Sequence, residues 1–333
     1  MRVVVTGATG NLGTSCVATL SEALHVREII GVARRTRDIA PEELGRTQLV
    51  SADITTTDLR PLFEGADAVV HLAWALQPSH DEAMLFRTNV RGSERVFEAA
   101  CRARVPVLVY ASSIGAYSPR TDDSLVEEDY PTGGISGSTY SAHKAAVERI
   151  LDGVVLENPA LRVVRLRPAL VFKHGVGTEI HRLFIGGLVP RRFLVPGRIP
   201  FVPDDLRFQC VHSLDVGQAI LRALTADVRG PFNLAADPVL GPHDLARLLK
   251  SRSTPIPKRL IRGSLSLAWH LHLAPSEPGW IDLAYGVPTI SSRRARDELG
   301  WTPSHGAADT LLELLDGIAE GAAMATPPLR AAG

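Results

Sequence analysis

The chain has few cysteines, no long apolar run and no excess of charge of either sign. Its three cysteines are widely spaced without a Cys-x-x-Cys pair, which argues against a disulfide framework or a metal site and predicts a reducing, cytoplasmic environment. No stretch approaches the roughly 18 apolar residues of a membrane helix, and the amino terminus lacks the apolar stretch of a signal peptide. With 36 basic and 36 acidic residues, the charge total predicts no nucleic-acid partner and no membrane partner.

Short runs rich in Val, Ile and Leu alternate with amphipathic segments through the first half of the chain. Nearly continuous apolar runs are typical of strands buried on both faces. Their alternation with helical segments predicts an α/β fold, a doubly wound parallel sheet of the Rossmann type. The six predicted strands are Val3–Thr6, Ile29–Ala33, Gln48–Val50, Ala68–Leu72, Val107–Ala111 and Arg162–Leu166.

The second half has a different texture and predicts a smaller, mainly helical substrate domain. Residues 1–170 are predicted to form the dinucleotide-binding domain, and residues 213–236, with a helical stretch and a short strand, to return to it. Residues 171–212 and 237–325 are predicted to form the substrate-binding part. Its apolar clusters, Leu265–Leu273 and Trp280–Leu283, either line a hydrophobic pocket or pack internally.

A glycine-rich turn, TGATGNLG, follows the first predicted strand and precedes a predicted helix. Glycines with this spacing permit a tight turn and let backbone N–H groups approach a pyrophosphate at the amino end of the helix. The alternative is a structural turn, but its place at the start of a βαβ series favours a dinucleotide site. The residues predicted to contact the cofactor here are Gly7, Thr9, Gly10, Asn11, Leu12 and Gly13.

The end of the second predicted strand bears on the choice of cofactor. A site that selects NAD usually carries an acid there for the ribose 2′-hydroxyl, whereas this chain has Arg34 and Arg35. Guanidinium groups hold a 2′-phosphate well. We therefore predict NADP, with NAD as the alternative; the pair would otherwise be a solvated basic loop, partly neutralised by Asp38.

Further cofactor contacts are predicted after the third and fourth strands. Asp53, followed by Ile54, is placed to accept a hydrogen bond from the adenine amino group, unless it is an ordinary turn aspartate. The backbone of Leu72 and Ala73 is expected to line the cofactor. His71, next to them, is interpreted as a packed strand histidine rather than a catalyst.

The segment YSAHK places Tyr140 and Lys144 four residues apart, on one face of a helix. An ammonium near the phenol, together with the positive nicotinamide of an oxidised cofactor, is expected to lower the pKa of Tyr140 from about 10. The phenol could then exchange a proton while the cofactor exchanges a hydride. Both side chains are also predicted to contact the cofactor.

These motifs occur in the order typical of the extended short-chain dehydrogenase/reductase family, of the NAD-dependent epimerase/dehydratase kind, which the chain resembles over roughly residues 1–170. The resemblance implies that Ser113 hydrogen-bonds the substrate oxygen, with Ser112 the neighbour to test, and that Pro168 lies near the nicotinamide. It also implies a homodimer. The motifs are TGATGNLG, Asp53, HLAW, TNVRG with Asn89, YASSIGAY, YSAHK, RLRPALVF and, near the C-terminus, ELGWTP.

The resemblance also narrows the reaction. The family's 4,6-dehydratases carry an Asp-Glu pair where this chain has Ile114 and Gly115, so elimination chemistry lacks its acid and base. In the family's sugar-nucleotide enzymes an arginine grips the substrate's diphosphate. At the matching position this chain has Phe208, and Arg207 one residue away would point to the opposite face of an extended segment. This departure weakens the sugar-nucleotide interpretation unless another arginine, such as Arg198, substitutes.

We therefore predict an NADP(H)-dependent oxidoreductase that acts on an alcohol or carbonyl group of a small-molecule substrate. The alternative is an NAD(P)-dependent sugar-nucleotide epimerase. A cofactor-sensing regulator on the same fold ranks third, because such proteins can lose the tyrosine and lysine that this chain retains.

Overall fold

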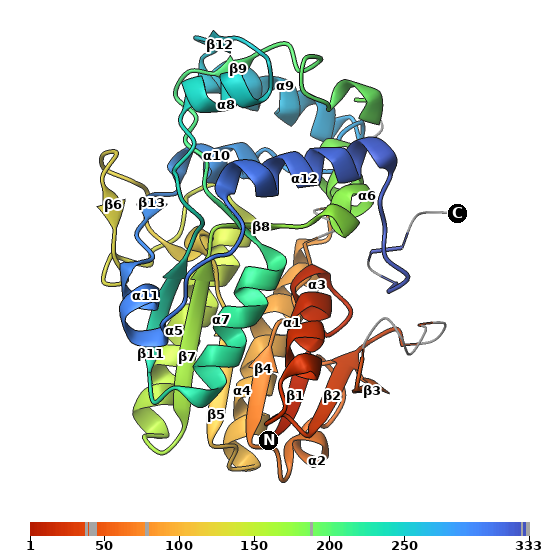
Figure 1. The fold of residues 1–333 in the computed structure, drawn as a ribbon, viewed down its shortest axis with the longest axis vertical. Helices are drawn as coiled ribbons and strands as arrows, with labels where there is room; N and C mark the ends of the chain where they lie inside the picture. The colour runs from red at the N-terminus through yellow and green to blue at the C-terminus, as the bar shows by residue number, and fades with distance from the viewer. Residues whose placement is uncertain (37–38, 40–44, 77–79, 187–188, 328, 331–333) are drawn as a thin grey trace.

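The computed structural model describes residues 1–36, 39, 45–76, 80–186, 189–327 and 329–330. A seven-stranded sheet with the order β11-β7-β5-β4-β1-β2-β3 forms the lower half of the molecule (Figure 1), and every neighbouring pair of strands in it is parallel. The six predicted strands are confirmed, and β11 adds a seventh from the second half of the chain. The strands are β1 Arg2–Thr6, β2 Glu28–Ala33, β3 Thr47–Ser51, β4 Ala68–His71, β5 Val107–Ala111, β7 Arg162–Pro168 and β11 Gly230–Leu234.

Two apolar cores lie on opposite faces of this sheet. Because successive side chains of a strand alternate, Val3 and Val5 of β1 join one core while Val4 joins the other. Helices α1 (Asn11–Glu22) and α7 (Ser213–Thr225) cover the first face. The second face is covered by α2 (Arg60–Phe63), α4 (Gly92–Arg102) and α5 (Thr139–Glu157). The predicted α/β fold, a Rossmann-type doubly wound parallel sheet, is confirmed.

The C-terminal part adds a mainly helical layer above the carboxyl ends of the strands (Figure 1). It has its own core, in which Leu245 packs with Leu311 and Leu315. No helix within the described residues is long and apolar enough to cross a membrane. The remaining helices are α3 Glu82–Phe86, α6 Gly177–Ile180, α8 Pro242–Leu248, α9 Lys258–His270, α10 Gly279–Gly286, α11 Arg293–Leu299 and α12 Ala307–Glu320.

Short elements connect this layer to the sheet. The 3₁₀ turns are η3 Ile114–Ala116, η4 His174–Val176 and η6 Arg191–Phe193, and the π-helical turns are η2 Arg87–Arg91 and η5 His181–Ile185. Three two-stranded parallel pairs join distant segments: β8 (Leu170–Phe172) with β10 (Cys210–His212), β9 (Val202–Pro203) with β12 (Ser253–Thr254), and β6 (Leu125–Val126) with β13 (Thr289–Ile290).

Candidate active site

The glycine turn between β1 and α1 is built so closely that side chains would not fit. Gly7 has φ +76°, and a Cβ there would lie 2.6 Å from the Ala73 backbone nitrogen; a Cβ on Gly13 would collide with the carbonyl oxygen of Gly7. Gly10 caps α1 without a side-chain hydrogen bond, and the first turn contains no acid. The backbone cradle and the uncapped helix start fit the pyrophosphate of a dinucleotide.

The other residues predicted to contact the cofactor follow the carboxyl ends of strands on the same edge of the sheet. Arg34 and Arg35 are exposed after β2, while Ile54 is buried against Gly92. Asp53 Oδ1 accepts hydrogen bonds from the Thr55 nitrogen at 2.8 Å and the Thr55 hydroxyl at 2.7 Å. Burial opposes ionisation of Asp53, but these bonds and the nearby Arg34 guanidinium hold its pKa below the usual value.

The remaining predicted positions lie close to the glycine turn or at the sheet edge. Leu72 and Ala73 follow β4 and lie directly against Gly7. Thr9 is buried and Pro168 ends β7. Asp38 lies outside the described residues.

Tyr140 and Ser113 come together at the amino end of α5. Tyr140 is one residue into the helix, which Ser138 caps by accepting a hydrogen bond from the Ser141 nitrogen. Burial raises the pKa of Tyr140 to about 12, and the hydrogen bond with Ser113 opposes this rise. Tyr140 is therefore a protonated phenol at neutral pH, held beside the serine.

Lys144 lies one helical turn further along α5, with its ammonium turned toward the end of β5. Its Nζ donates to the Ala111 carbonyl oxygen at 2.8 Å and lies 3.6 Å from the centre of the Trp74 ring, but 5.9 Å from that of Tyr140. Burial lowers the pKa of Lys144 to about 7, although Glu148 opposes this. Burial raises the pKa of Tyr140 in the protein by itself, so the lowering expected from Lys144 together with an oxidised nicotinamide stays a prediction for the cofactor-bound state.

The two neighbouring serines have different partners. Ser112 Oγ donates to Glu148 Oε1 at 2.6 Å, whereas Ser113 bonds to Tyr140 and accepts from the Gly115 nitrogen at 3.0 Å. Ser112 is therefore part of the support beneath the site, and Ser113 belongs to the site itself.

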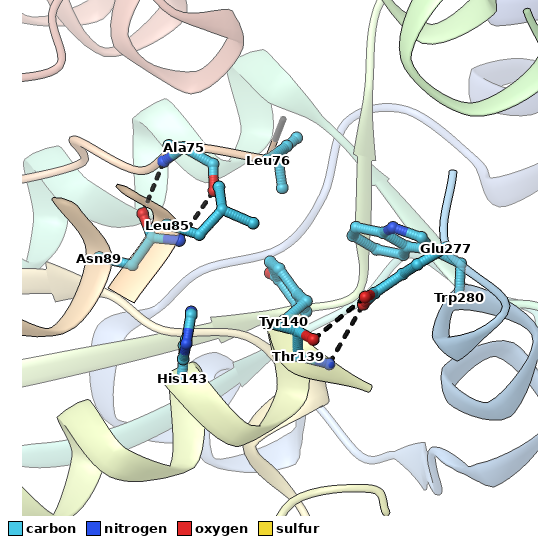
Figure 2. A pocket seen from close by; sticks show the side chains of 9 residues that line it. All are labelled: Ala75, Leu76, Leu85, Asn89, Thr139, Tyr140, His143, Glu277 and Trp280. Atoms are coloured by element: carbon cyan, nitrogen blue, oxygen red, sulfur yellow. Dashed lines mark hydrogen bonds between the residues drawn. The ribbon is translucent and has the colours of Figure 1, made fainter. Parts of the chain in front are cut away.

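A small cavity opens beside Tyr140 (Figure 2). Two of its lining residues are aromatic: the Trp280 ring lies 5.0 Å from that of Tyr140, and the Phe184 ring lies 4.7 Å from that of Trp280 on the outside of the lining. In the predicted cluster Trp280–Leu283, Trp280 lines the cavity and Leu283 is buried. In the other predicted cluster, Leu265–Leu273, the expectation of lining or packing was wrong for Leu267, Leu271 and Leu273, whose side chains are exposed. The lining residues are Ala75, Leu76, Leu85, Asn89, Thr139, Tyr140, His143, Glu277 and Trp280.

Two polar clamps shape this cavity, as Figure 2 shows. Asn89 accepts from the Ala75 nitrogen at 2.7 Å and donates to its carbonyl oxygen at 2.8 Å. Glu277 accepts from both the nitrogen and the hydroxyl of Thr139. Asn89 lies in a π-helical turn, which is common at functional sites and leaves no signal in hydrophobic periodicity.

The arginine predicted one residue out of register lies away from this cavity. Arg207 is partly exposed and pairs with Asp123, while Phe208 packs on Phe172 and bridges to Leu240. The two side chains serve different surroundings, as expected for neighbours in extended backbone.

The sequence matches the NAD-dependent epimerase/dehydratase family over residues 3–235, and the chain belongs to that family. That family is of the extended short-chain dehydrogenase/reductase type.

Three curated relatives illustrate the similarity. An uncharacterised Mycobacterium tuberculosis protein is 27% identical over 93% of the chain, which spans only 29% of that relative's length. A second uncharacterised protein of the same organism is 28% identical over 90% of the chain and 80% of its own length. A Synechocystis sp. protein with the provisional name dihydroflavonol 4-reductase is 28% identical over 47% of the chain and 48% of its own length.

Two solved structures share the fold. UDP-glucose 4-epimerase from Thermotoga maritima, solved with UDP-glucose, aligns with a TM-score of 0.70 at 20% identity, over 96% of this chain and 99% of its own. MoeE5, solved with UDP-glucuronic acid and NAD, aligns with a TM-score of 0.69 at 20% identity, over 96% of this chain and 100% of its own.

Proposed function

We propose that the chain transfers a hydride between the nicotinamide of a bound NAD(P) and the carbon of an alcohol or carbonyl group, with Tyr140 as the proton donor and acceptor. The observation that carries this proposal is the position of Tyr140 beside the buried Ser113, on the sheet edge that also bears the glycine turn. In parallel α/β sheets ligands bind at the carboxyl ends of the strands. A cofactor on the glycine turn and a substrate beside Tyr140 would therefore lie next to each other.

The cofactor would bind to residues within the range 1–170. The turn from Gly7 to Gly13 would hold the pyrophosphate, Arg34 with Arg35 a 2′-phosphate, and Asp53 the adenine. When bound, the cofactor supplies or accepts the hydride, and in its oxidised form adds a positive charge. We further propose that residues 1–170 with 213–236 form the cofactor domain, and that 171–212 with 237–325 bind the substrate.

The proton chemistry follows from the state of Tyr140. In the reducing direction, Ser113 and Tyr140 would hydrogen-bond the carbonyl oxygen, and Tyr140 would give that oxygen its proton as the carbon gains the hydride. A phenol with a pKa of about 12 holds its proton at neutral pH, which suits the role of an acid. In the oxidising direction the phenolate must form, and a positive charge beside it would favour that form.

The comparisons support the epimerase alternative better than the NADP(H)-dependent reductase predicted first. The matched family is described by epimerase and dehydratase activities, and the solved structures above include an epimerase with a UDP-sugar. An epimerase uses the same oxidation and reduction in sequence, so the proposed roles of Tyr140 and Ser113 hold for either reaction.

One feature of the site favours the reductase. The rings of Trp74 and Trp280 lie beside that of Tyr140, and Phe184 lies against Trp280, an aromatic surface that suits an apolar carbonyl compound. The family name and the aromatic lining therefore point to different substrates for one chemistry.

Replacing Tyr140 with Phe tests the shared chemistry. The variant removes the proton donor while keeping the ring, so turnover should fall at least about 100-fold with cofactor affinity nearly unchanged. Turnover within a few-fold of the unmodified protein would reject the role of Tyr140.

Two measurements separate the reactions. Protein purified with stoichiometric NAD that resists dialysis would favour the epimerase, and exchangeable NADPH the reductase. Arg34→Ala should weaken NADPH by about 10- to 100-fold but NADH little, since one charged hydrogen bond contributes about 1.5–3 kcal/mol. Equal losses for both cofactors would reject the preference for NADP.

A further inference from the structure

The equal totals of basic and acidic residues conceal a strong separation of charge along the chain. Residues 180–203 and 245–276, here called the basic segments, contain ten Lys or Arg and no Asp or Glu. Since the chain has 36 of each sign, the rest carries 26 basic and 36 acidic residues. The ten are Arg182, Arg191, Arg192, Arg198, Arg247, Lys250, Arg252, Lys258, Arg259 and Arg262.

The fold brings the basic segments into one region. β9 of the first segment pairs with β12 of the second, with Val202 opposite Ser253. At the other end, Ser276 Oγ donates to the carbonyl oxygens of Leu183 and Phe184. Both segments therefore lie in the helical upper layer, where Figure 1 shows β9, β12 and α9 at the end of the molecule away from the sheet.

The same region exposes large apolar side chains. All thirteen residues of α9 are described and none of them is buried. Leu260, Leu267 and Leu271 lie on one side of the helix, at spacings of seven and four, and are 61%, 63% and 59% exposed. Leu273, just beyond α9, is 55% exposed. Apolar side chains grouped in this way on a surface mark an interaction site.

Some cations of the basic segments pair with acids, such as Arg247 with Asp244, and others do not. Lys258 and Arg262 pair with Asp282 of α10, which ties the polar side of α9 to the protein. Within the described part of the chain, Arg192, Arg198 and Arg259 form no ion pair with an acid. Phe193, next to Arg192 in sequence, and Phe201, three residues beyond Arg198, are also exposed.

We propose that the basic segments dock the protein on an anionic lipid surface, with α9 lying in the plane of the membrane interface. An amphipathic helix with leucines on one side and cations beside them binds in this way, the leucines entering the acyl boundary and the cations meeting the headgroups. The exposed leucines favour a bilayer over a nucleic acid, because phosphate contacts bury no aliphatic surface. The prediction of no membrane partner rested on the equal totals of basic and acidic residues, and such totals do not show that ten cations are concentrated in the basic segments.

This inference goes beyond the proposed function and does not depend on it. Docking would leave the cavity close to the lipid, because α9 packs on α10, the helix that carries Trp280.

Sedimentation with lipid vesicles tests the proposal on the full chain. The probes are vesicles of phosphatidylcholine alone and vesicles with roughly a third phosphatidylserine, an anionic headgroup that attracts basic segments. The unmodified protein should sediment with the anionic vesicles, and binding should fall as salt is raised.

Two variants separate the apolar and the charged contributions. Leu267→Glu should weaken binding about tenfold or more, because burying a leucine contributes roughly 1.5–3 kcal/mol. The double variant Arg192→Glu with Arg259→Glu should weaken it by at least about 25-fold, at about fivefold for each cation. Thermal unfolding should match the unmodified protein, since all three side chains are at the surface.

Matched controls lie elsewhere on the molecule. Leu156→Glu on α5 changes a leucine that is 82% exposed, and Arg149→Glu changes an exposed arginine of the same helix. Both should bind vesicles like the unmodified protein. The proposal is overturned if the controls lose as much binding as the α9 variants, if anionic and neutral vesicles bind equally, or if a DNA duplex competes more strongly than the vesicles. It is equally overturned if Leu267→Glu abolishes only self-association.

Discussion

The buried carboxylate of Glu148 is the residue beneath the active site whose replacement should be most damaging. Its two oxygens accept from Arg165 at 2.9 Å, from Arg167 at 2.9 and 3.1 Å, and from Ser112 at 2.6 Å. The Glu148 side chain is 1% exposed, so three charges are held together out of water. Glu148 is also one turn beyond Lys144, which links this network to the proposed catalytic helix.

Glu148→Gln keeps the shape of the side chain and removes its charge. Two guanidinium groups then lose their shared counter-charge, and the new amide offers them a donor in place of an acceptor. Breaking a buried ion pair from one side costs about 3–5 kcal/mol. The pKa gives a similar magnitude: burial alone would raise it, but Arg167, Arg165 and Ser112 bring it down from 4.5 to about 2. At about 1.4 kcal/mol per pH unit this is roughly 3 kcal/mol.

The assay is urea-induced unfolding followed by circular dichroism at neutral pH. The matched control is Asp152→Asn, because Asp152 also pairs with Arg165 but its side chain is 59% exposed. An exposed pair contributes about 0–1 kcal/mol, so the control should unfold almost like the unmodified protein. If Glu148→Gln loses no more unfolding free energy than Asp152→Asn, the buried network around Glu148 does not stabilise the fold.

The pH dependence provides a second readout. Because the folded pKa of Glu148 lies below the unfolded one, its contribution is complete above about pH 4.5 and disappears as the pH falls through about 2. The unmodified protein should therefore lose stability across that acidic window, and Glu148→Gln should lose less there.

Further substitutions test the glycine turn, the two neighbouring serines and Asn89. Gly13→Ala should cost about 1–3 kcal/mol in unfolding free energy by overpacking the turn, whereas Gly10→Ala, with 3.5 Å of room, should be tolerated; equal effects in urea unfolding would contradict this. Ser113→Ala should lower turnover, whereas Ser112→Ala should leave turnover nearly unchanged. Each should cost about 1–3 kcal/mol in unfolding free energy, because each hydroxyl serves a buried partner. Asn89→Leu leaves the buried backbone nitrogen and carbonyl oxygen of Ala75 unpaired and should cost about 2–4 kcal/mol in unfolding free energy, measured in urea. An unchanged unfolding free energy would show that these two hydrogen bonds do not stabilise the fold.

The sheet could be predicted because its strands carry a local signal. Runs such as Val107–Ala111 are apolar on both faces, and only a sheet covered on both sides buries such runs. The glycine turn could also be predicted from the sequence, because glycines at this spacing between a strand and a helix are typical of a dinucleotide-binding turn. The pocket was not, because Trp280 and Glu277 lie more than 130 residues from Tyr140 and Thr139 in the chain, and no spacing rule links them.

By itself, the sequence determined the class of fold, the order of its elements and the residues proposed for redox chemistry, because periodicity, turn glycines and short motifs act over a few neighbouring residues. Tertiary structure alone decided what those residues experience. It separated Ser113 from Ser112, turned Lys144 toward Ala111, and set the pKa of Tyr140 by burial. It also gathered ten cations from two distant segments, because charge and desolvation depend on distance in space and not along the chain.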